Sequence, residues 1–375
     1  MLEASVRRDD LKEALAFAGG AVLSNTSMPL LGDVAIAAED GALTFAATDL
    51  ELHLSVRIPA GAAGRGGALA VPAGALGDFA KSAPDPDVRL TETGGRRLTA
   101  ESGPFRAEII CDGTEDFPPA PAEAPRTAGT LPGGALADAL DKTRHTASPS
   151  VRNFNLSGVC LQSAGGELEL VSSDADILCK ATAPGGDFAL DCPALISRKA
   201  AEQLRAFAAD AGGGPLAMER TESFLTARAG GKTFNARLLG GAFPDWRALM
   251  PEGEREDLAV RRETFVRDLG NVGNFVSPQY RVVFLDFGDG TVRLSAEDSR
   301  KGSASTSQPT AGDVAGPRSF GLDPANLLKV LKTLRGDTAV FRWHGPKSPV
   351  VLTSDGDPGF LALISTVTPK EGGAS

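Results

Sequence analysis

The sequence predicts an α+β protein made of three tandem copies of one unit, each with two helices packed on antiparallel sheet. A glycine, an alternating strand and an aspartate recur as GALTFAATD at residues 41–49, GELELVSSD at 166–174 and GTVRLSAED at 290–298. The copies lie 125 and 124 residues apart, and Phe-Pro steps at 117–118 and 243–244 repeat after 126 residues. Agreement of several landmarks at one period indicates a threefold repeat.

Each copy is predicted to contain two helices. The first helices are expected at residues 8–18, 134–146 and 262–275. A proline introduces each second helix, at Pro72, Pro193 and Pro324, because the first helical turn tolerates the missing N–H of proline. Apolar residues then recur at helical spacing, most clearly in the third copy.

The repeated phrases predict strands, because apolar residues alternate with small or polar ones at the period of a half-buried strand. Turn sequences at 93–96 and 229–232 lie between alternating runs and predict hairpins. Residues 118–133, rich in proline, and the charged stretch 251–257 are predicted linkers. The expected limits of the units are 1–122, 130–252 and 256–369, followed by a tail at 370–375.

The composition is that of a soluble globular protein, with 42% hydrophobic and 23% charged residues in a chain of 375. No apolar run has the length that a membrane span requires. The N-terminus lacks the basic and apolar segments of a secretory signal. These features predict a cytoplasmic protein without a membrane partner.

The sequence offers little support for catalysis or metal binding. Its four cysteines form no CxxC pair and its three histidines are isolated, so we expect no metal site and no cofactor. A glycine-rich GGKT segment at 230–233 has threonine, Thr226, where a phosphate-binding loop begins with glycine. Asp49, Asp174 and Asp298 occupy equivalent places in three units, which favours a turn role over a carboxylate cluster.

The order of these motifs resembles that of the bacterial beta sliding clamp, the beta subunit of DNA polymerase III. The similarity is greatest at residues 6–57, which include LGDV at 31–34. FPDWR at 243–247 and the pair VR 151–152 with LSG 156–158 also follow the family pattern. The resemblance covers nearly the whole chain.

The resemblance implies that three clamp units form half of a ring, which a second copy closes head to tail. The implied dimer contacts are Ala107 and Ile109 on one side and Asn274 and Phe275 on the other. The alternative for Ile109 and Phe275 is a role in the core of their own units.

Charge is unevenly distributed in a way that suits a ring around duplex DNA. The six predicted helical stretches sum to a net charge of +6, whereas the whole chain carries −10 and the remainder therefore −16. A cationic lining attracts the phosphate backbone without reading bases. The expected DNA-contacting residues are Arg198, Lys199, Arg205, Lys329, Lys332, Arg335, Arg152 and Asn25, of which Asn25 stands where the family often has a basic residue. Solvated helix faces are the alternative explanation.

The family also binds short peptides of its partners in an apolar pocket. The residues carried over here are Leu156, Ser173, Asp174, Ala175, Asp176, Ile177, Leu178, Pro244, Leu249, Leu363, Ser365 and Thr366. This chain reads SDADIL at 173–178 and STVTP at 365–369, where the family usually has TDGHRL and MPMRL. The acidic Asp176 should favour basic peptides, and the missing methionine removes an adaptable contact. Unchanged specificity is the alternative.

The predicted function is therefore that of a non-catalytic processivity factor in DNA replication. Its expected partners are double-stranded DNA, a second copy, the DNA polymerase III alpha subunit, the clamp loader and other proteins that carry a clamp-binding motif. A clamp-like paralogue with altered peptide specificity, acting as an accessory or inhibitor-tolerant clamp, is the second hypothesis. A hydrolase on a repeat scaffold is the third, although no nucleophile–base arrangement is visible.

Overall fold

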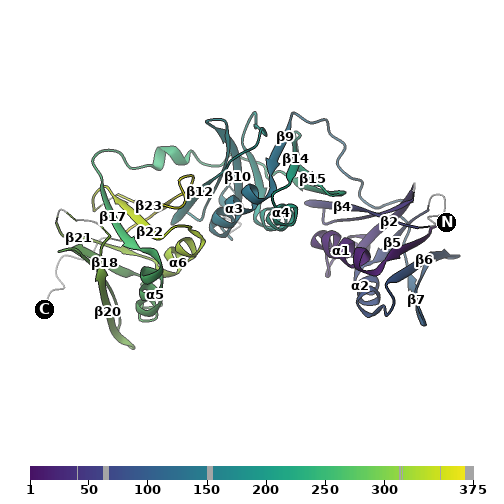
Figure 1. The fold of residues 1–375 in the computed structure, drawn as a ribbon, viewed down its shortest axis with the longest axis horizontal. Coiled ribbons are helices and arrows are strands. Elements are labelled where there is room, and N and C mark those ends of the chain that lie inside the picture. The colour runs from purple at the N-terminus through teal and green to yellow at the C-terminus, as the bar shows by residue number, and fades with distance from the viewer. Residues whose placement is uncertain are drawn as a thin grey trace. The chain divides into compact units, whose positions relative to one another are not determined.

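The computed structural model describes residues 1–39, 41–61, 67–149, 155–311, 314, 316–346 and 348–367. It confirms the α+β class and a threefold order of elements, in which every copy runs strand, helix, four strands, helix and three strands (Figure 1). The first copy comprises β1 (Glu3–Arg7), α1 (Arg8–Ala18), β2 (Asp33–Glu39), β3 (Ala42–Thr48), β4 (Leu52–Pro59), β5 (Gly67–Pro72), α2 (Ala73–Ser82), β6 (Asp87–Thr93), β7 (Arg97–Ser102) and β8 (Phe105–Ile110).

The other two copies repeat this order. The second comprises β9 (Thr127–Pro132), α3 (Gly133–Thr143), β10 (Gly158–Ala164), β11 (Glu167–Ser173), β12 (Ile177–Ala183), β13 (Ala194–Ser197), α4 (Arg198–Ala211), β14 (Pro215–Arg220), β15 (Phe224–Ala229) and β16 (Lys232–Arg237). The third comprises β17 (Glu256–Arg261), α5 (Arg262–Gly273), β18 (Val283–Gly288), β19 (Thr291–Asp298), β20 (Gly302–Pro309), β21 (Arg318–Leu322), α6 (Pro324–Thr333), β22 (Thr338–Trp343), β23 (Val350–Ser354) and β24 (Leu361–Ile364).

Two compact units divide the chain, and the second copy contributes to both. The first unit contains residues 1–134, 187–191 and 206–238, and the second contains 135–186, 192–205 and the chain from 239 onward. In the first unit, an eight-stranded antiparallel sheet runs β5-β2-β3-β4-β16-β15-β14-β9. In the second, the equivalent sheet runs β13-β10-β11-β12-β24-β23-β22-β17. Each large sheet thus joins strands from two successive copies.

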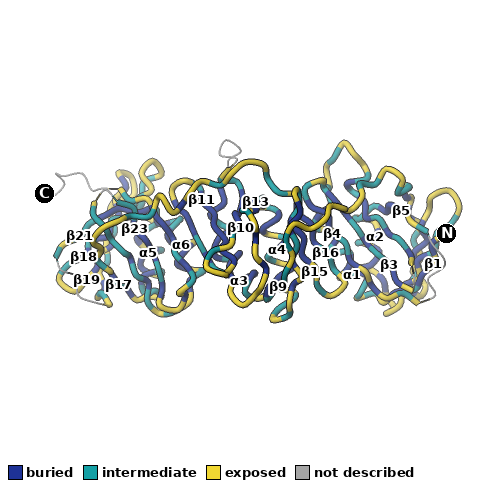
Figure 2. The backbone as a smooth tube through the Cα atoms, turned by 90° about the horizontal axis from the view of Figure 1, so that it is seen from above, coloured by how far each residue is buried: buried dark blue, intermediate teal, exposed yellow. Residues whose placement is uncertain are grey.

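A four-stranded sheet accompanies each large sheet. The first unit contains β1-β6-β7-β8, and the second contains β20-β19-β18-β21. Buried residues follow the strands, whereas exposed residues gather in the loops (Figure 2). None of the helices in the described residues is long and apolar enough to cross a membrane.

The repeated aspartates have the structural role that the sequence predicts. The Oδ1 atom of Asp49 accepts hydrogen bonds from the backbone N–H groups two and three residues later. Asp174 and Asp298 do the same in the second and third copies. Such turns connect β3 to β4, β11 to β12 and β19 to β20, so the side chains replace missing backbone partners.

Helix boundaries follow their capping residues and apolar spacing. On α1, Leu11, Ala14 and Ala18 are buried at helical spacing. At the start of α6, Asp323 accepts hydrogen bonds from the N–H groups of Ala325 and Asn326, with proline at the first helical position.

The structure corrects two local predictions. Pro193 does not introduce the second helix of its copy, because β13 intervenes and α4 begins at Arg198. The predicted linker at 118–133 contains β9, which pairs antiparallel with β14. In both places, pairing with strands distant in sequence outweighs the local propensity of proline and glycine.

Candidate binding surfaces

A groove of about 570 Å³ in the second unit brings together many of the predicted pocket residues. It lies beside the pairing of β12 with β24, in which Leu178 is opposite Leu363. The predicted residues that line it are Ser173, Ala175, Asp176, Leu178, Leu249, Leu363, Ser365 and Thr366.

An apolar cluster supports the floor of this groove. Leu178 and Leu363 are buried together with Val171, Trp246 and Val351. By contrast, Leu249 is 56% exposed, so one large apolar residue faces solvent at the groove. An exposed leucine beside a buried apolar floor is typical of a surface that gains free energy when a partner covers its apolar area.

Asp176 is the charged residue among the described side chains that line the groove. Its backbone N–H donates to Asp174 Oδ1 and its carbonyl accepts from the N–H of Ser365, so the position of its backbone is fixed on both sides. Asp176 is exposed, and its carboxylate forms no ion pair with any other described residue. The groove therefore combines an apolar floor with a negative rim.

Four predicted pocket residues lie outside the lining of the groove. Asp174 holds the turn and Ile177 is buried in β12. Pro244 lines a neighbouring cavity of about 240 Å³ that also contains Trp246. The Leu156 carbonyl accepts the N–H of Ser148.

Sequence reasoning missed three residues that line the groove. Ala248 lies in the short helix at Trp246–Leu249, which Asp245 caps by accepting the N–H of Arg247. Ser348 and Pro349 precede β23, and the Ser348 carbonyl accepts a hydrogen bond from Thr366 Oγ1 at 3.2 Å. The proximity of Ala248 to the predicted Leu249 was an available signal, but the other two become neighbours only through the sheet.

Three of the predicted DNA-contacting arginines, Arg198, Arg205 and Arg335, have acidic partners. Arg205 forms a bidentate pair with Asp141, at 2.7 Å for the shortest N–O distance. Although burial opposes it, hydrogen bonds from Arg205 and Arg144 lower the pKa of Asp141. Arg198 lies 3.4 Å from Glu202 on its own helix, and Arg335 lies 2.6 Å from Asp138. The net positive potential of these arginines is therefore smaller than a count of cations suggests.

Two lysines of α6 are placed differently. Lys329 and Lys332 are exposed, three residues apart on the side opposite the buried Leu327, Val330 and Leu331. Within the described residues neither lysine forms an ion pair. Lys199 is half-buried on α4, and Asn25 is exposed between two short helical turns. Arg152 lies outside the described residues.

The predicted dimer contacts lie on or beside two strands at the edges of the small sheets. Ala107 and Ile109 belong to β8, the edge of β1-β6-β7-β8. Asn274 and Phe275 follow α5, and Lys301, just before the edge strand β20, donates to the Asn274 carbonyl at 2.9 Å. Ile109 is buried within its own unit, as the alternative role expects, whereas the neighbouring Ile110 is 69% exposed.

The cysteines have the environment of structural thiols. Burial raises the pKa of Cys111 to about 11 and those of Cys160 and Cys179 to about 12. These thiols stay protonated near neutral pH and are poor nucleophiles. No cluster of three or more His, Cys, Asp or Glu residues suited to a metal ion occurs among the described residues.

Comparison with known proteins agrees with the geometry. Residues 2–121 match the family model described as DNA polymerase III beta subunit, N-terminal domain. The beta sliding clamp of Caulobacter vibrioides (strain NA1000 / CB15N) is 25% identical over 376 residues, which cover 97% of this chain and 99% of that protein.

Solved structures extend the similarity to the whole fold. The sliding clamp of Pseudomonas aeruginosa bound to griselimycin has a TM-score of 0.91 at 22% identity, covering 98% of this chain and 100% of that one. The DNA polymerase sliding clamp of Bacillus subtilis has a TM-score of 0.92 at 20% identity, covering 98% and 99%. These matches show that residues 2–121 resemble the N-terminal domain of the DNA polymerase III beta subunit, and that the whole chain has the fold of the solved sliding clamps.

Proposed function

We propose that this protein is a DNA sliding clamp: it closes with a second copy into a ring around duplex DNA and tethers the replicative polymerase. The observation that carries the proposal is the threefold repeat itself, found in a chain that matches beta sliding clamps over nearly its full length. We take the three clamp units to be residues 1–122, 130–252 and 256–369. The protein would act in the cytoplasm and catalyse no reaction of its own.

Unpaired strand edges support a head-to-tail ring. Within the chain, β4 pairs with β16 and β12 pairs with β24, each time joining one copy to the next. The third copy's equivalent of β4 and β12 is β20, and the first copy's equivalent of β16 and β24 is β8. The same order would therefore pair β20 with β8, but within the described sheets of one chain both are edge strands. Exposed edges favour pairing with another chain, and a contact between different surfaces can close into a ring.

DNA would be held by topology rather than by tight binding. The two α6 lysines and Lys199 would supply weak, sequence-independent phosphate contacts, while the paired arginines add little net charge. Weak contact is compatible with sliding, because each lysine can exchange one phosphate for the next.

Partners would dock in the groove above the Leu178–Leu363 floor. An apolar peptide side chain would cover Leu249, and the negative rim would select against acidic flanking residues. Such altered specificity would also suit the second candidate function, an accessory or inhibitor-tolerant clamp. The observation favouring that candidate is the carboxylate of Asp176 at the rim.

A combined mass and extension assay tests the proposal. We expect a solution mass of about twice the 38.6 kDa chain, and longer products from a DNA polymerase III core when clamp and loader are added to primed circular DNA. A strict monomer, or a dimer that never lengthens the products, would contradict the assigned role. Failure with the host replicative polymerase but success with another polymerase would favour the accessory clamp.

A further inference from the structure

We propose a specific closing contact for the ring: β8 of one copy pairs with β20 of the other so that Ile109 lies opposite Gly302, and Arg267 faces Asp85 of the second copy. The inference rests on the proposed ring and adds the register and the charged contact. It derives from the two junctions between copies that the chain contains within its units.

The internal junctions define the register. The ladders β1-β6-β7-β8, β9-β14-β15-β16 and β17-β22-β23-β24 have the same order. The residue before the first helix of each copy, which is Arg7, Pro132 or Arg261, serves as a common reference on the first strand of each ladder. When the paired residues are followed from strand to strand, Ile109, Ala236 and Ile364 lie at the same distance from this reference and are therefore equivalent. The ladders β5-β2-β3-β4, β13-β10-β11-β12 and β21-β18-β19-β20 are compared in the same way, with the residue before each second helix as the reference. In these ladders Gly302 is equivalent to Leu52 and Ile177.

Both internal junctions pair these equivalent positions directly. Leu52 lies opposite Ala236, and Ile177 lies opposite Ile364. The third junction should therefore place Gly302 opposite Ile109. Two residues further along Ala304 would meet Ala107, and four residues further along Thr306 would meet Phe105.

Burial agrees with this register. On β20, Ala304 and Thr306 are less exposed than their neighbours Ser303, Ser305 and Ser307. On β8, Ile109 and Ala107 are less exposed than Glu108. The register therefore places the more sheltered residues of both edges on one face, as antiparallel pairing requires.

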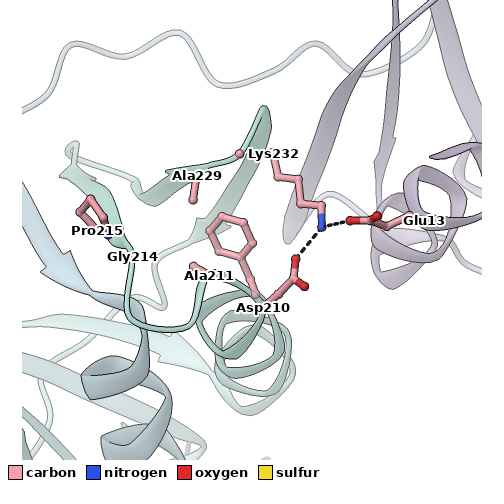
Figure 3. A pocket seen from close by; sticks show the side chains of 9 residues that line it. Glu13, Asp210, Ala211, Gly214, Pro215, Ala229 and Lys232 are labelled. Atoms are coloured by element: carbon pink, nitrogen blue, oxygen red, sulfur yellow. Dashed lines mark hydrogen bonds and ion pairs between the residues drawn. The ribbon is translucent and has the colours of Figure 1, made fainter.

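Three positions carry the charges at the first internal junction (Figure 3). Glu13 lies on α1 of the first copy, while Asp210 near the end of α4 and Lys232 on β16 belong to the second copy. The Lys232 ammonium group lies 2.6 Å from each carboxylate. These three residues line a cavity of about 430 Å³.

At the second internal junction, the positions equivalent to Glu13, Asp210 and Lys232 carry different residues. Asp138 takes the place of Glu13 on α3, since both lie five residues after the start of their helices. Arg335, just beyond α6, reaches Asp138 at 2.6 Å. The place of Lys232 on β16 is taken at this junction by Phe360, which is buried and directly precedes β24. This junction therefore combines an aromatic residue with a direct ion pair.

The third junction repeats this second arrangement with reversed charges. Arg267 lies five residues after the start of α5 and is 67% exposed, although it also contacts the neighbouring Asp268 at 2.9 Å. The exposed Asp85 follows α2 at nearly the place that Arg335 takes after α6. Phe105 holds the aromatic position, stacked on Phe79 at 5.0 Å.

Charges on the opposite face of β8 are already paired within the chain. Arg97 lies 3.5 Å from Glu108, and Arg106 lies 3.5 Å from Glu101. Across the junction the register would place Ser303 and Ser305 beside them. We therefore assign the electrostatic part of ring closure to Arg267 and Asp85.

Cysteine cross-linking tests the register. The double variant Ala107→Cys/Ala304→Cys should form a covalent dimer on mild oxidation, because directly opposite residues lie within disulfide reach. The matched variant Ala107→Cys/Thr306→Cys should not, because it is displaced by two residues along the strand. Cross-linking of the second variant but not the first would overturn the register. Wild-type protein controls for the native cysteines.

Charge reversal tests the ion pair. Arg267→Glu or Asp85→Arg should each raise the dimer dissociation constant about tenfold, since a ring has two such junctions and one exposed pair changes affinity by about threefold. The double variant Arg267→Glu/Asp85→Arg should return close to the wild-type value, and Arg261→Glu, with the same change in charge, should have little effect.

The two possible failures are distinguishable by sedimentation equilibrium. A wild-type protein that stays monomeric would defeat the proposed ring. A stable wild-type dimer whose dissociation constant ignores both single reversals would leave the ring intact and overturn the assigned pair.

Discussion

Neutralising the two exposed lysines of α6 should weaken DNA binding far more than removing a salt-bridged arginine. In Lys329→Gln/Lys332→Gln, a ring of two copies loses four cations that have no acidic partner among the described residues. If each contacts one phosphate, the slope of log affinity against log salt concentration should become shallower by about 3.6, at about 0.9 per contact. Partial engagement of the lysines would give a smaller change in the same direction.

The matched control removes a pair of charges instead. Arg198→Gln/Glu202→Gln deletes the ion pair at 3.4 Å within α4 but leaves the net charge unchanged. We expect its slope to lie within about 0.5 of the wild-type value, because an arginine held by a carboxylate releases few counterions.

Fluorescence anisotropy with a short linear duplex, titrated at four or more salt concentrations, measures both slopes. A linear duplex is suitable because it measures contact without topological capture. The reasoning is refuted if the lysine variant keeps the wild-type slope, or if the control loses as much as the lysine variant does.

Three further predictions concern single residues. Burial, followed by the nearby Asp112, raises the pKa of Asp33 from 3.8 to about 6. The stability that this group contributes is fully present below pH 3.8 and is lost as the pH rises through 6, because the buried carboxyl must then ionise. The variant Asp33→Asn should therefore raise the free energy of unfolding of the protein by up to about 3 kcal/mol at pH 7.5. Urea unfolding should show this gain at pH 7.5 and no gain at pH 4. A peptide with lysine beside its apolar anchor should bind severalfold tighter than its glutamate analogue, and Asp176→Asn should abolish that preference in a titration. Lys142→Met should cost about 3–5 kcal/mol in urea unfolding, because it leaves the buried Asp357 carboxylate unpaired; a loss below 1 kcal/mol would contradict this.

Local patterns predicted much of the fold. The alternating phrases became β3, β11 and β19, and the aspartates that end them form the same turn in all three copies. These features depend on neighbours in sequence, so a short window of residues contains their cause. The strand β9 was missed because its sequence, TAGTLP, has little strand propensity and forms by pairing with β14.

The candidate sites depend more on distant residues. Counting charges on helices could not reveal that Arg205 meets Asp141, which is 64 residues away in sequence. Likewise, Ser348 joins the groove through its contact with Thr366. The family pattern supplied Leu178 and Leu363 as pocket positions, and the structure adds that these two residues are buried together beneath the groove, whereas Leu249 is exposed and Pro244 lines a neighbouring cavity.

Retention on DNA tests the central claim most directly. Clamp loaded onto nicked circular plasmid should elute with the DNA during gel filtration, and cutting the plasmid once should release it within minutes, because a ring slides off a free end. Equal retention on circular and linearised plasmid, or none on either, would contradict a clamp that holds DNA by encircling it.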